Sequence, residues 1–226
     1  MINNIVKRIF TSLFLIIILF IGLYYNDFTW EGLVIFFLIL CFYEFYNLIN
    51  KIYFNKFFIS LLIFLIASYL YVFYFIFINI KIQYGEEVIL ILLITCVFSD
   101  IGGYVTGKLV GGPKLISISP NKTISGSLGS ILLTVVGTNL FIVFLNNIDK
   151  KPNFLETSLI FYLWLIIMSI YCQIGDLLIS YLKRKAKIKD TGNILPGHGG
   201  ILDRLDGVLF AIPFGVLTYF ILTLIR

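Results

Sequence analysis

Residues that could carry out chemistry gather near one end of this chain, between positions 173 and 207. Asp176 lies in an apolar segment that ends in a run of cations. These cations are Lys183, Arg184, Lys185, Lys187 and Lys189. A glycine-rich loop with the only histidine, His198, follows, and three charged residues then open the next apolar segment: Asp203, Arg204 and Asp206. Carboxylates bind hard metal ions, and cations with glycine amides bind phosphates, so the stretch suggests phosphate and metal chemistry.

The polar residues at the start of this stretch would form a stripe along a helix. Their spacings of three, four, three and one place them on one helical face: Gln173, Asp176, Ser180, Lys183 and Arg184. Asp203 and Asp206 are also three residues apart and share a face. A few carboxylates beside cations suit Mg²⁺ carried in with a polyphosphate, and the cations would neutralise a leaving pyrophosphate. The cations could also be no more than a topology signal.

The loop between these two segments is rich in glycine. Its glycines surround Pro196 and His198: Gly192, Gly197, Gly199 and Gly200. Glycine lets backbone amides approach phosphate oxygens closely. A histidine flanked by glycines has little hydrophobic core to pack against, which favours a functional role for His198.

A second group of polar residues lies upstream. Asp100 lies within an apolar segment, where a buried carboxylate is costly unless it is paired or binds a metal. Gly103 and Gly107 share its helical face, so a ligand or another helix could come close. The alternative is helix packing with Asp100 paired to a lysine. Residues 102–108 spell most of a P-loop, but Leu109 follows in place of Ser or Thr and the context is a membrane helix, so we reject a P-loop.

The loop after this segment gathers hydroxyl groups around a lysine: Ser117, Ser119, Lys122, Thr123, Ser125 and Ser127. Hydroxyls and backbone amides at a helix start, beside a lysine, can bind an anion. Simple capping of the next helix by Ser125 or Ser127 would explain them equally well. The pattern alone leaves both interpretations open.

Membrane helices must position these groups. The chain has 226 residues, of which 60% are hydrophobic and 13% are charged, and its mean hydropathy is +1.02. These values exclude an ordinary soluble domain and predict an all-α polytopic membrane protein. The net charge of +5 suits lipid headgroups and phosphates better than nucleic acid. The three cysteines lie in apolar segments without metal-site spacing, so we interpret them as packing residues.

The apolar segments predict seven spans: residues 9–25, 32–49, 57–80, 88–110, 128–145, 158–181 and 205–225. The third is long enough to leave open a break or a tilt. Most of the 17 Lys and Arg residues then lie on one side. The positive-inside rule places that side, with the N-terminus and the loops 111–127 and 182–204, in the cytoplasm.

We therefore expect an integral protein of the inner or plasma membrane. Residues 1–85 would form an N-terminal membrane region, and residues 86–226 would form the catalytic region. The first segment is expected to stay as a helix, because no small-residue cleavage site follows it. Glu44 lies near the inner end of the second segment, where it either has a function or snorkels to the interface.

The same residues carry a family signature. From Ser180 to Asp206 the chain contains S-x-L-K-R, K-D-x-G, L-P-G-H-G-G and D-R-L-D, with Q-x-G-D before them. Upstream it contains D-I-G-G-Y, G-K, K-L and I-S-P-N-K-T in order. In these motifs the chain resembles the phosphatidate cytidylyltransferase (CDP-diacylglycerol synthase) family. Ile124 and Ser125 stand where that family often has Trp and Glu, so neither is given a role.

The resemblance implies transfer of CMP from CTP to phosphatidic acid, which gives CDP-diacylglycerol and pyrophosphate with the help of Mg²⁺. A second metal ion and a homodimer are left open. The resemblance assigns the metal to Asp176 and Asp203, and catalysis to these two with Lys183 and Arg184. It implies substrate contacts for Asp100, Ser119, Lys122, Thr123, Lys189, Asp190, His198, Arg204 and Asp206. The second pKa of a phosphate monoester is near 6, so no general base is needed and His198 would position ligands.

Two other functions are weighed against this one. A CTP-dependent polyprenol or phytol kinase would transfer the γ-phosphate through a similar membrane core, but the L-P-G-H-G-G and D-R-L-D motifs favour the cytidylyltransferase. An ion-coupled transporter would use Asp100 and Asp176 as a coupling pair. The polar residues instead cluster at one membrane face, and no interrupted helix marks the midplane.

Overall fold

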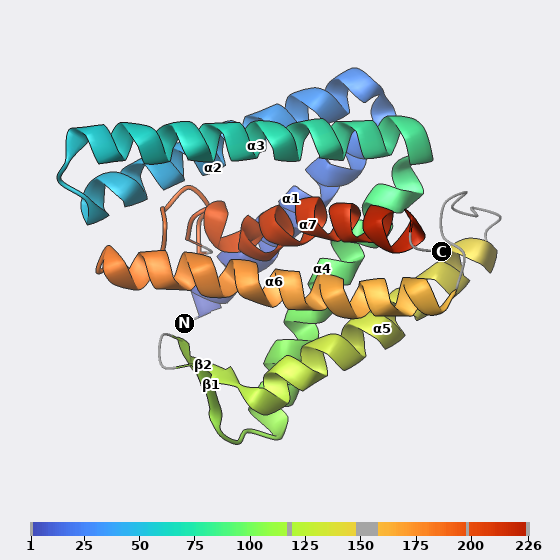
Figure 1. The fold of residues 1–226 in the computed structure, drawn as a ribbon. Helices are drawn as coiled ribbons and strands as arrows, with labels where there is room; N and C mark the ends of the chain where they lie inside the picture. The colour runs from blue at the N-terminus through green and yellow to red at the C-terminus, as the bar shows by residue number, and fades with distance from the viewer. Residues whose placement is uncertain (1, 117–118, 148–157, 198, 225–226) are drawn as a thin grey trace. The chain divides into compact units, whose positions relative to one another are not determined.

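The computed structural model describes residues 2–116, 119–147, 158–197 and 199–224. Seven helices and one short hairpin occupy this part of the chain (Figure 1). The helices are α1 (Ile2–Tyr25), α2 (Asp27–Ile52), α3 (Lys56–Tyr84), α4 (Glu86–Leu109), α5 (Ile124–Asn147), α6 (Leu159–Lys185) and α7 (Leu202–Leu224). The antiparallel strands are β1 (Lys114–Ile116) and β2 (Ser119–Thr123). The predicted all-α class is confirmed.

The count of membrane spans differs from the prediction. Among the described residues, six helices are long and apolar enough to cross a membrane, namely α2 to α7. The apolar part of α1 is the shorter stretch Ile9–Tyr25. At ~1.5 Å per residue this stretch falls a few ångströms short of the ~30 Å hydrocarbon core. The predicted seven spans are therefore wrong by one, while α3 is a single unbroken helix. The protein is an integral membrane protein with several spans.

The helices divide into two compact units. The first comprises Met1–Ile78 and Leu182–Leu205, and the second comprises Asn79–Tyr181 and Asp206–Arg226. Helices α6 and α7 each contribute residues to both units. The proposed division into residues 1–85 and 86–226 stays a prediction.

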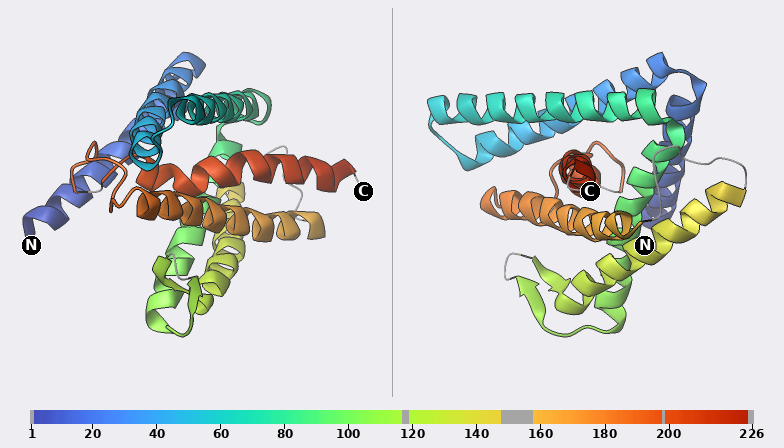
Figure 2. Two further views of the ribbon diagram at one scale, coloured as in Figure 1. Left: turned by 60° about the vertical axis from the view of Figure 1, so that its left-hand side comes forward. Right: turned by 45° about the vertical axis from the view of Figure 1, so that its right-hand side comes forward.

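In the first unit, α2 packs through one face. The buried residues recur at helical spacing: Trp30, Val34, Leu38, Cys41, Glu44, Leu48 and Ile49. Trp30 packs on Phe77 of α3 with ring centroids 5.3 Å apart, and Figure 2 shows α2 and α3 side by side. The helix begins cleanly because Asn26 and Thr29 cap it reciprocally, with 2.6 Å between the Thr29 amide and Asn26 Oδ1. Glu44 is the one carboxylate among these buried residues of α2.

In the second unit, glycines let helix backbones approach closely. Helices α4 and α5 pack together, and the β1–β2 hairpin joins them (Figure 2). A Cβ at Gly102 would collide with the carbonyl oxygen of Gly129, and one at Gly129 would collide with Thr106. Helices α6 and α7 meet at Gly175, where a Cβ would collide with the backbone of Asp206. The first two contacts bring α4 and α5 together. Hydrogen bonds from both helices then reach α6.

Candidate functional site

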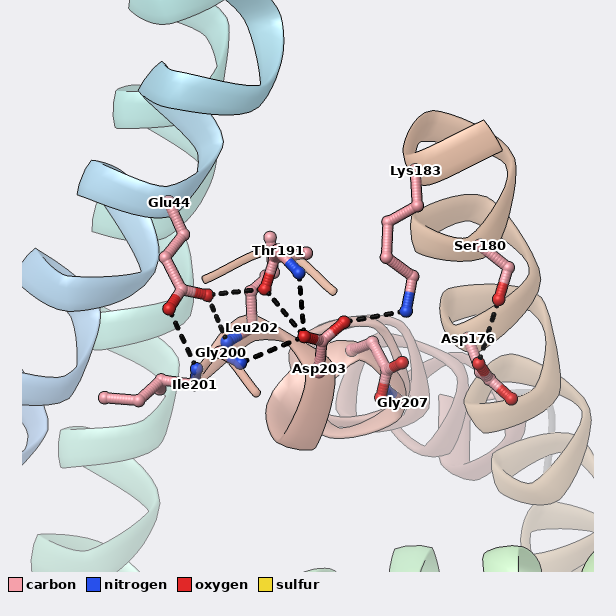
Figure 3. A network of polar contacts seen from close by, with 11 residues as sticks. Glu44, Asp176, Ser180, Lys183, Thr191, Gly200, Ile201, Leu202, Asp203 and Gly207 are labelled. Carbon is pink, nitrogen blue, oxygen red and sulfur yellow. Dashed lines mark hydrogen bonds and ion pairs between the residues drawn. The ribbon is translucent and has the colours of Figure 1, made fainter. Parts of the chain in front are cut away.

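Two groups of residues joined by polar contacts stand out, one in each unit, and some members of the first take part only through their backbone amides. The loop cluster lies in the first unit around the segment that joins α6 to α7: Glu44, Lys183, Thr191, Gly200, Ile201, Leu202 and Asp203. The hairpin cluster lies in the second unit: Ser99, Asp100, Lys122, Ser127, Ser169, Cys172, Gln173, Asp176 and Ser180. Figure 3 shows the side chains of Glu44, Thr191 and Asp203 turned toward one another, with Lys183 reaching Asp203 from α6.

Asp203 is held from both of its carboxylate oxygens. Oδ2 accepts hydrogen bonds from the amides of Thr191 at 2.8 Å and Gly200 at 3.0 Å. Oδ1 accepts one from Lys183 Nζ at 2.7 Å, and the side chains of Lys183 and Asp203 are 17% and 8% exposed. Hydrogen bonds to a charged carboxylate are among the strongest in proteins, and a shielded pair is screened less by salt. Asp203 therefore ties the loop to α6 as well as carrying charge.

Glu44 reaches the same loop from α2. Its Oε1 accepts a hydrogen bond from the amide of Ile201 at 3.0 Å. Its Oε2 accepts from the amide of Leu202 at 2.9 Å and from the Thr191 hydroxyl at 2.7 Å. The residue is 1% exposed. The snorkelling alternative for Glu44 is therefore wrong, because the carboxylate is enclosed and bound by loop donors.

The glycines of the loop have two different uses. Gly197 and Gly199 have φ values of 80° and 87°, a left-handed conformation that glycine adopts without strain. The Leu195 amide donates to the Gly199 carbonyl at 2.9 Å and closes the turn. Gly200, which was expected to expose an amide to phosphate, donates that amide to Asp203. His198 lies outside the described residues, and its role stays a prediction.

In the hairpin cluster, Lys122 of β2 forms an ion pair with Oδ2 of Asp176 on α6. Ser180 donates to Oδ1 of Asp176 across a long 3.4 Å. The side chains of Lys122 and Asp176 are 25% and 32% exposed, so water and ligands can reach both. The structure thus joins the lysine predicted to contact the nucleotide and a carboxylate predicted to hold the metal.

A chain of hydrogen bonds links α4, α5 and α6 beside this pair. Ser127 donates to Oε1 of Gln173 at 2.6 Å. Nε2 of Gln173 donates to the Ser169 hydroxyl at 3.4 Å, and that hydroxyl lies 2.9 Å from the Ser99 hydroxyl. Helix α6 is continuous through Gln173, Asp176, Ser180, Lys183 and Arg184. The predicted polar stripe therefore exists, and its first part bonds to neighbouring helices.

Asp100 differs from the expectation. It lies within α4, but it is exposed rather than buried. The Cys172 thiol donates to its Oδ1 at 3.7 Å. Helix α4 is long and apolar enough to cross a membrane, where a carboxylate that faces lipid is still costly. The predicted functional or paired role of Asp100 therefore stays a prediction.

Helix α5 is capped by neither Ser125 nor Ser127. Thr123 Oγ1 accepts a hydrogen bond from the Gly126 amide at 3.0 Å, so Thr123 is the capping residue. The predicted capping by Ser125 or Ser127 is wrong. Ser125 instead donates to the Gly111 carbonyl, and Ser127 bonds to Gln173.

The remaining predicted residues lie around the two clusters. Ser119 pairs with Ile116 in the hairpin, and Asp206 accepts a hydrogen bond from the Gly207 amide at 2.9 Å. Four others are exposed: Arg184, Lys189, Asp190 and Arg204. Asp176 belongs to the second unit and Asp203 to the first, so their convergence stays a prediction.

The carboxylates fit a magnesium ion that arrives with a polyphosphate. The described residues hold no group of three or more His, Cys, Asp or Glu side chains able to bind a metal. Such an ion takes most of its ligands from phosphates and water and needs only one or two carboxylates. Each carboxylate oxygen accepts about two hydrogen bonds. Oδ1 of Asp203 and both oxygens of Asp176 therefore keep acceptor capacity for one metal contact each.

Sequence reasoning missed one residue of the loop cluster and undervalued another. Thr191 filled the unassigned position of the K-D-x-G motif, yet its hydroxyl contacts both Glu44 and Asp203. Glu44 was left open, although it falls on the helical repeat of Leu38, Cys41 and Leu48. That repeat was a readable signal that Glu44 faces the protein interior.

Comparison with known proteins places the chain in a family. The profile of the Cytidylyltransferase family matches residues 51–222. Proteins named phosphatidate cytidylyltransferase are similar: 41% identical over 141 residues in Helicobacter pylori (62% of this chain, 50% of the relative), 41% over 147 residues in Bacillus subtilis (63% and 49%), and 39% over 142 residues in Mycobacterium leprae (62% and 42%). The chain spans about half the length of these relatives or less. It belongs to the cytidylyltransferase family.

Proposed function

We propose that this chain transfers CMP from CTP to phosphatidic acid, which gives CDP-diacylglycerol and pyrophosphate. The family membership and the names of relatives at about 40% identity support this activity. The observation that carries it in the structure is a pair of acid–lysine contacts among the signature residues, Lys122 with Asp176 and Lys183 with Asp203.

The reaction needs charge neutralisation more than proton transfer. A phosphate oxygen of the lipid forms a bond to the α-phosphorus of CTP, and the bond from that phosphorus to the bridging oxygen breaks. Pyrophosphate leaves with the electron pair. The second pKa of a phosphate monoester is near 6, so the attacking oxygen is already ionised at neutral pH. The protein therefore has to align two anions and offset their charge.

The residues divide this work by position. Asp176 and Asp203 would hold Mg²⁺, which supplies charge neutralisation and alignment of the triphosphate when bound. The cations of the α6 end and the α7 start would bind phosphates: Lys183, Arg184, Lys189 and Arg204. Three of these cations are exposed, namely Arg184, Lys189 and Arg204. Exposure supports this role, because an exposed cation can reach an incoming anion. Ser119, Lys122 and Thr123 of the hairpin would contact the nucleotide.

We also propose that the segments after α2, α4 and α6 face the cytoplasm, where CTP is found. These segments hold most of the loop lysines and arginines, in line with the positive-inside rule. The predicted cytoplasmic N-terminus depended on a seventh span and is not part of this proposal. A homodimer and a second metal ion stay predictions.

The proposal is tested by product analysis. Purified full-length protein in detergent micelles would be incubated with CTP, Mg²⁺ and phosphatidic acid, and the lipids identified by mass spectrometry. CDP-diacylglycerol with an equal amount of pyrophosphate is expected. Formation of CDP together with a phosphorylated polyprenol or phytol, when those alcohols are supplied, would instead identify a lipid kinase and contradict the proposal.

A further inference from the structure

Glu44 lies outside the part of the chain that matches the family, which begins at residue 51. It also lies on a helix that carries none of the signature motifs. Its hydrogen-bond partners are nevertheless 147 to 158 residues away, in the loop and at the start of α7. A carboxylate from the N-terminal region therefore reaches the middle of the signature.

We infer that Glu44 is a positioning residue. It holds Thr191 and the first turn of α7 in the conformation in which Asp203 binds Lys183. This inference rests on the proposed function in that Asp203 and Lys183 would take part in CMP transfer, whereas the hold of Glu44 on the loop does not depend on the activity. Glu44 would act through Asp203 and would touch neither substrate.

The first support is the identity of the amides that Glu44 binds. Ile201 and Leu202 lie at the N-terminus of α7, where amides have no partner within the helix and carry partial positive charge. A side chain within the same turn usually fills this role. Here the carboxylate of another helix fills it, so the start of α7 is fixed relative to α2.

The second support is steric. A Cβ at Gly192 would lie 2.5 Å from Oε1 of Glu44, and one at Gly200 would collide with Oε2 of Glu44 and with Thr191 Oγ1. Two glycines of the signature loop therefore have no room for a side chain because Glu44 occupies the space. The loop and Glu44 fit each other in this conformation.

The third support is a direct link to Asp203. The Thr191 hydroxyl lies 2.7 Å from Oε2 of Glu44 and 3.0 Å from Oδ2 of Asp203. A hydroxyl has one proton and can donate to only one carboxylate at a time. The two carboxylates also share the neighbouring backbone amides. The Gly200 amide donates to Asp203, and the amides of Ile201 and Leu202 donate to Glu44. A shift of Glu44 would therefore change the donors available to Asp203, and Asp203 holds Lys183 at 2.7 Å.

A charged group is needed for this task. A buried carboxylate is expensive unless donors surround it, and an apolar residue would fill the same volume at less cost. An apolar residue would leave the amides of Ile201 and Leu202 and the Thr191 hydroxyl without this acceptor. We therefore interpret the charge at Glu44 as serving the loop conformation rather than the packing of α2.

The test compares Glu44→Gln with wild-type protein by two readouts. Glutamine keeps the size, but one of its two polar atoms is a donor and would face the loop donors. The first readout needs no activity: it is the rate at which trypsin cleaves folded protein after Lys187 and Lys189, which lie between the end of α6 and Thr191. Losing one charge-assisted bond should raise the cleavage rate about tenfold. The second is kcat and KM per folded molecule, where kcat should fall about tenfold or more while Tm and elution volume stay close to wild type.

Glu31→Gln is the matched control, because Glu31 lies on the same helix and accepts a hydrogen bond from Tyr74 rather than from the loop. It should leave both readouts unchanged. If Glu44→Gln does not fold, Thr191→Val carries the test, since it removes the shared hydroxyl at nearly constant volume. It should loosen the loop and lower kcat in the same way.

Wild-type cleavage and wild-type kcat in the folded variants would overturn the inference. So would a loss of activity that matches the loss of folded protein, because that result describes a purely structural residue. Should wild-type protein form no CDP-diacylglycerol at all, the proposed function fails. The trypsin comparison would still decide whether Glu44 positions the loop.

Discussion

Lys183 donates a hydrogen bond to Oδ1 of Asp203 across 2.7 Å, within a pair whose side chains are 17% and 8% exposed. The proposed function gives these residues different tasks, phosphate binding for Lys183 and metal binding for Asp203, and the structure holds them together. Removing one partner of a shielded pair leaves the other with an uncompensated charge. The two roles are therefore coupled, and a substitution at either residue should affect both.

Asp203→Asn tests this coupling. The substitution keeps the shape but removes the charge that Lys183 and a metal ion both use, so kcat should fall by on the order of a hundredfold. The measurement is CMP transfer per folded molecule, with Tm as a check on folding. Asp27→Asn, an exposed acid in the first turn of α2, should behave like wild type. Near-normal turnover in Asp203→Asn would contradict the assignment.

Lys122→Ala tests the hairpin. Lys122 pairs with Asp176 and is a quarter exposed, so it can bind an incoming triphosphate. Its loss should raise the KM for CTP about tenfold, which corresponds to one hydrogen bond to a charged group. The KM for phosphatidic acid should change little. Lys114→Ala on the paired strand is the control. A change confined to the lipid KM would place the nucleotide elsewhere.

Removal of the metal provides a third test. Chelation of divalent ions should abolish transfer, and added Mg²⁺ should restore it. Asp176→Asn should need a higher Mg²⁺ concentration for half-maximal rate, because one of the few protein ligands is lost. Full activity in the presence of a chelator would show that neither carboxylate serves a required metal.

Membrane topology can be tested at two positions. Lys114 lies after α4 and Lys187 after α6, and two spanning helices separate them. Cysteines introduced at both positions in intact cells should resist a membrane-impermeant maleimide until the cells are opened. Labelling of either position in intact cells would contradict the cytoplasmic placement of the loops.

Local features of the chain could be predicted well. Long apolar runs gave the helices, and the spacing of Gln173, Asp176 and Ser180 gave a polar stripe that lies on α6. Capping was less predictable, because Thr123 and Ser125 are both good capping residues and lie only two residues apart. The predicted number of spans was wrong because hydropathy alone does not show whether an apolar stretch of 17 residues is long enough to cross the membrane.

Contacts between distant parts of the chain could not be predicted from the sequence. Glu44 was visible as a carboxylate on a buried repeat, but nothing local showed that Thr191 and Ile201 would bind it. Asp100 shows a different case, because its apolar segment suggested burial among helices and the folded protein leaves it on the outer surface of α4. Burial depends on which helices pack where, and that information is spread over the whole chain.

The central claim is that this protein moves the nucleotidyl group of CTP, and the position of a radiolabel tests it most directly. With CTP labelled at the α-phosphate and phosphatidic acid as acceptor, the label should appear in the lipid fraction. With CTP labelled at the γ-phosphate, it should appear only in pyrophosphate. Label from the γ-phosphate in the lipid, or no label in the lipid from either substrate, would contradict the account.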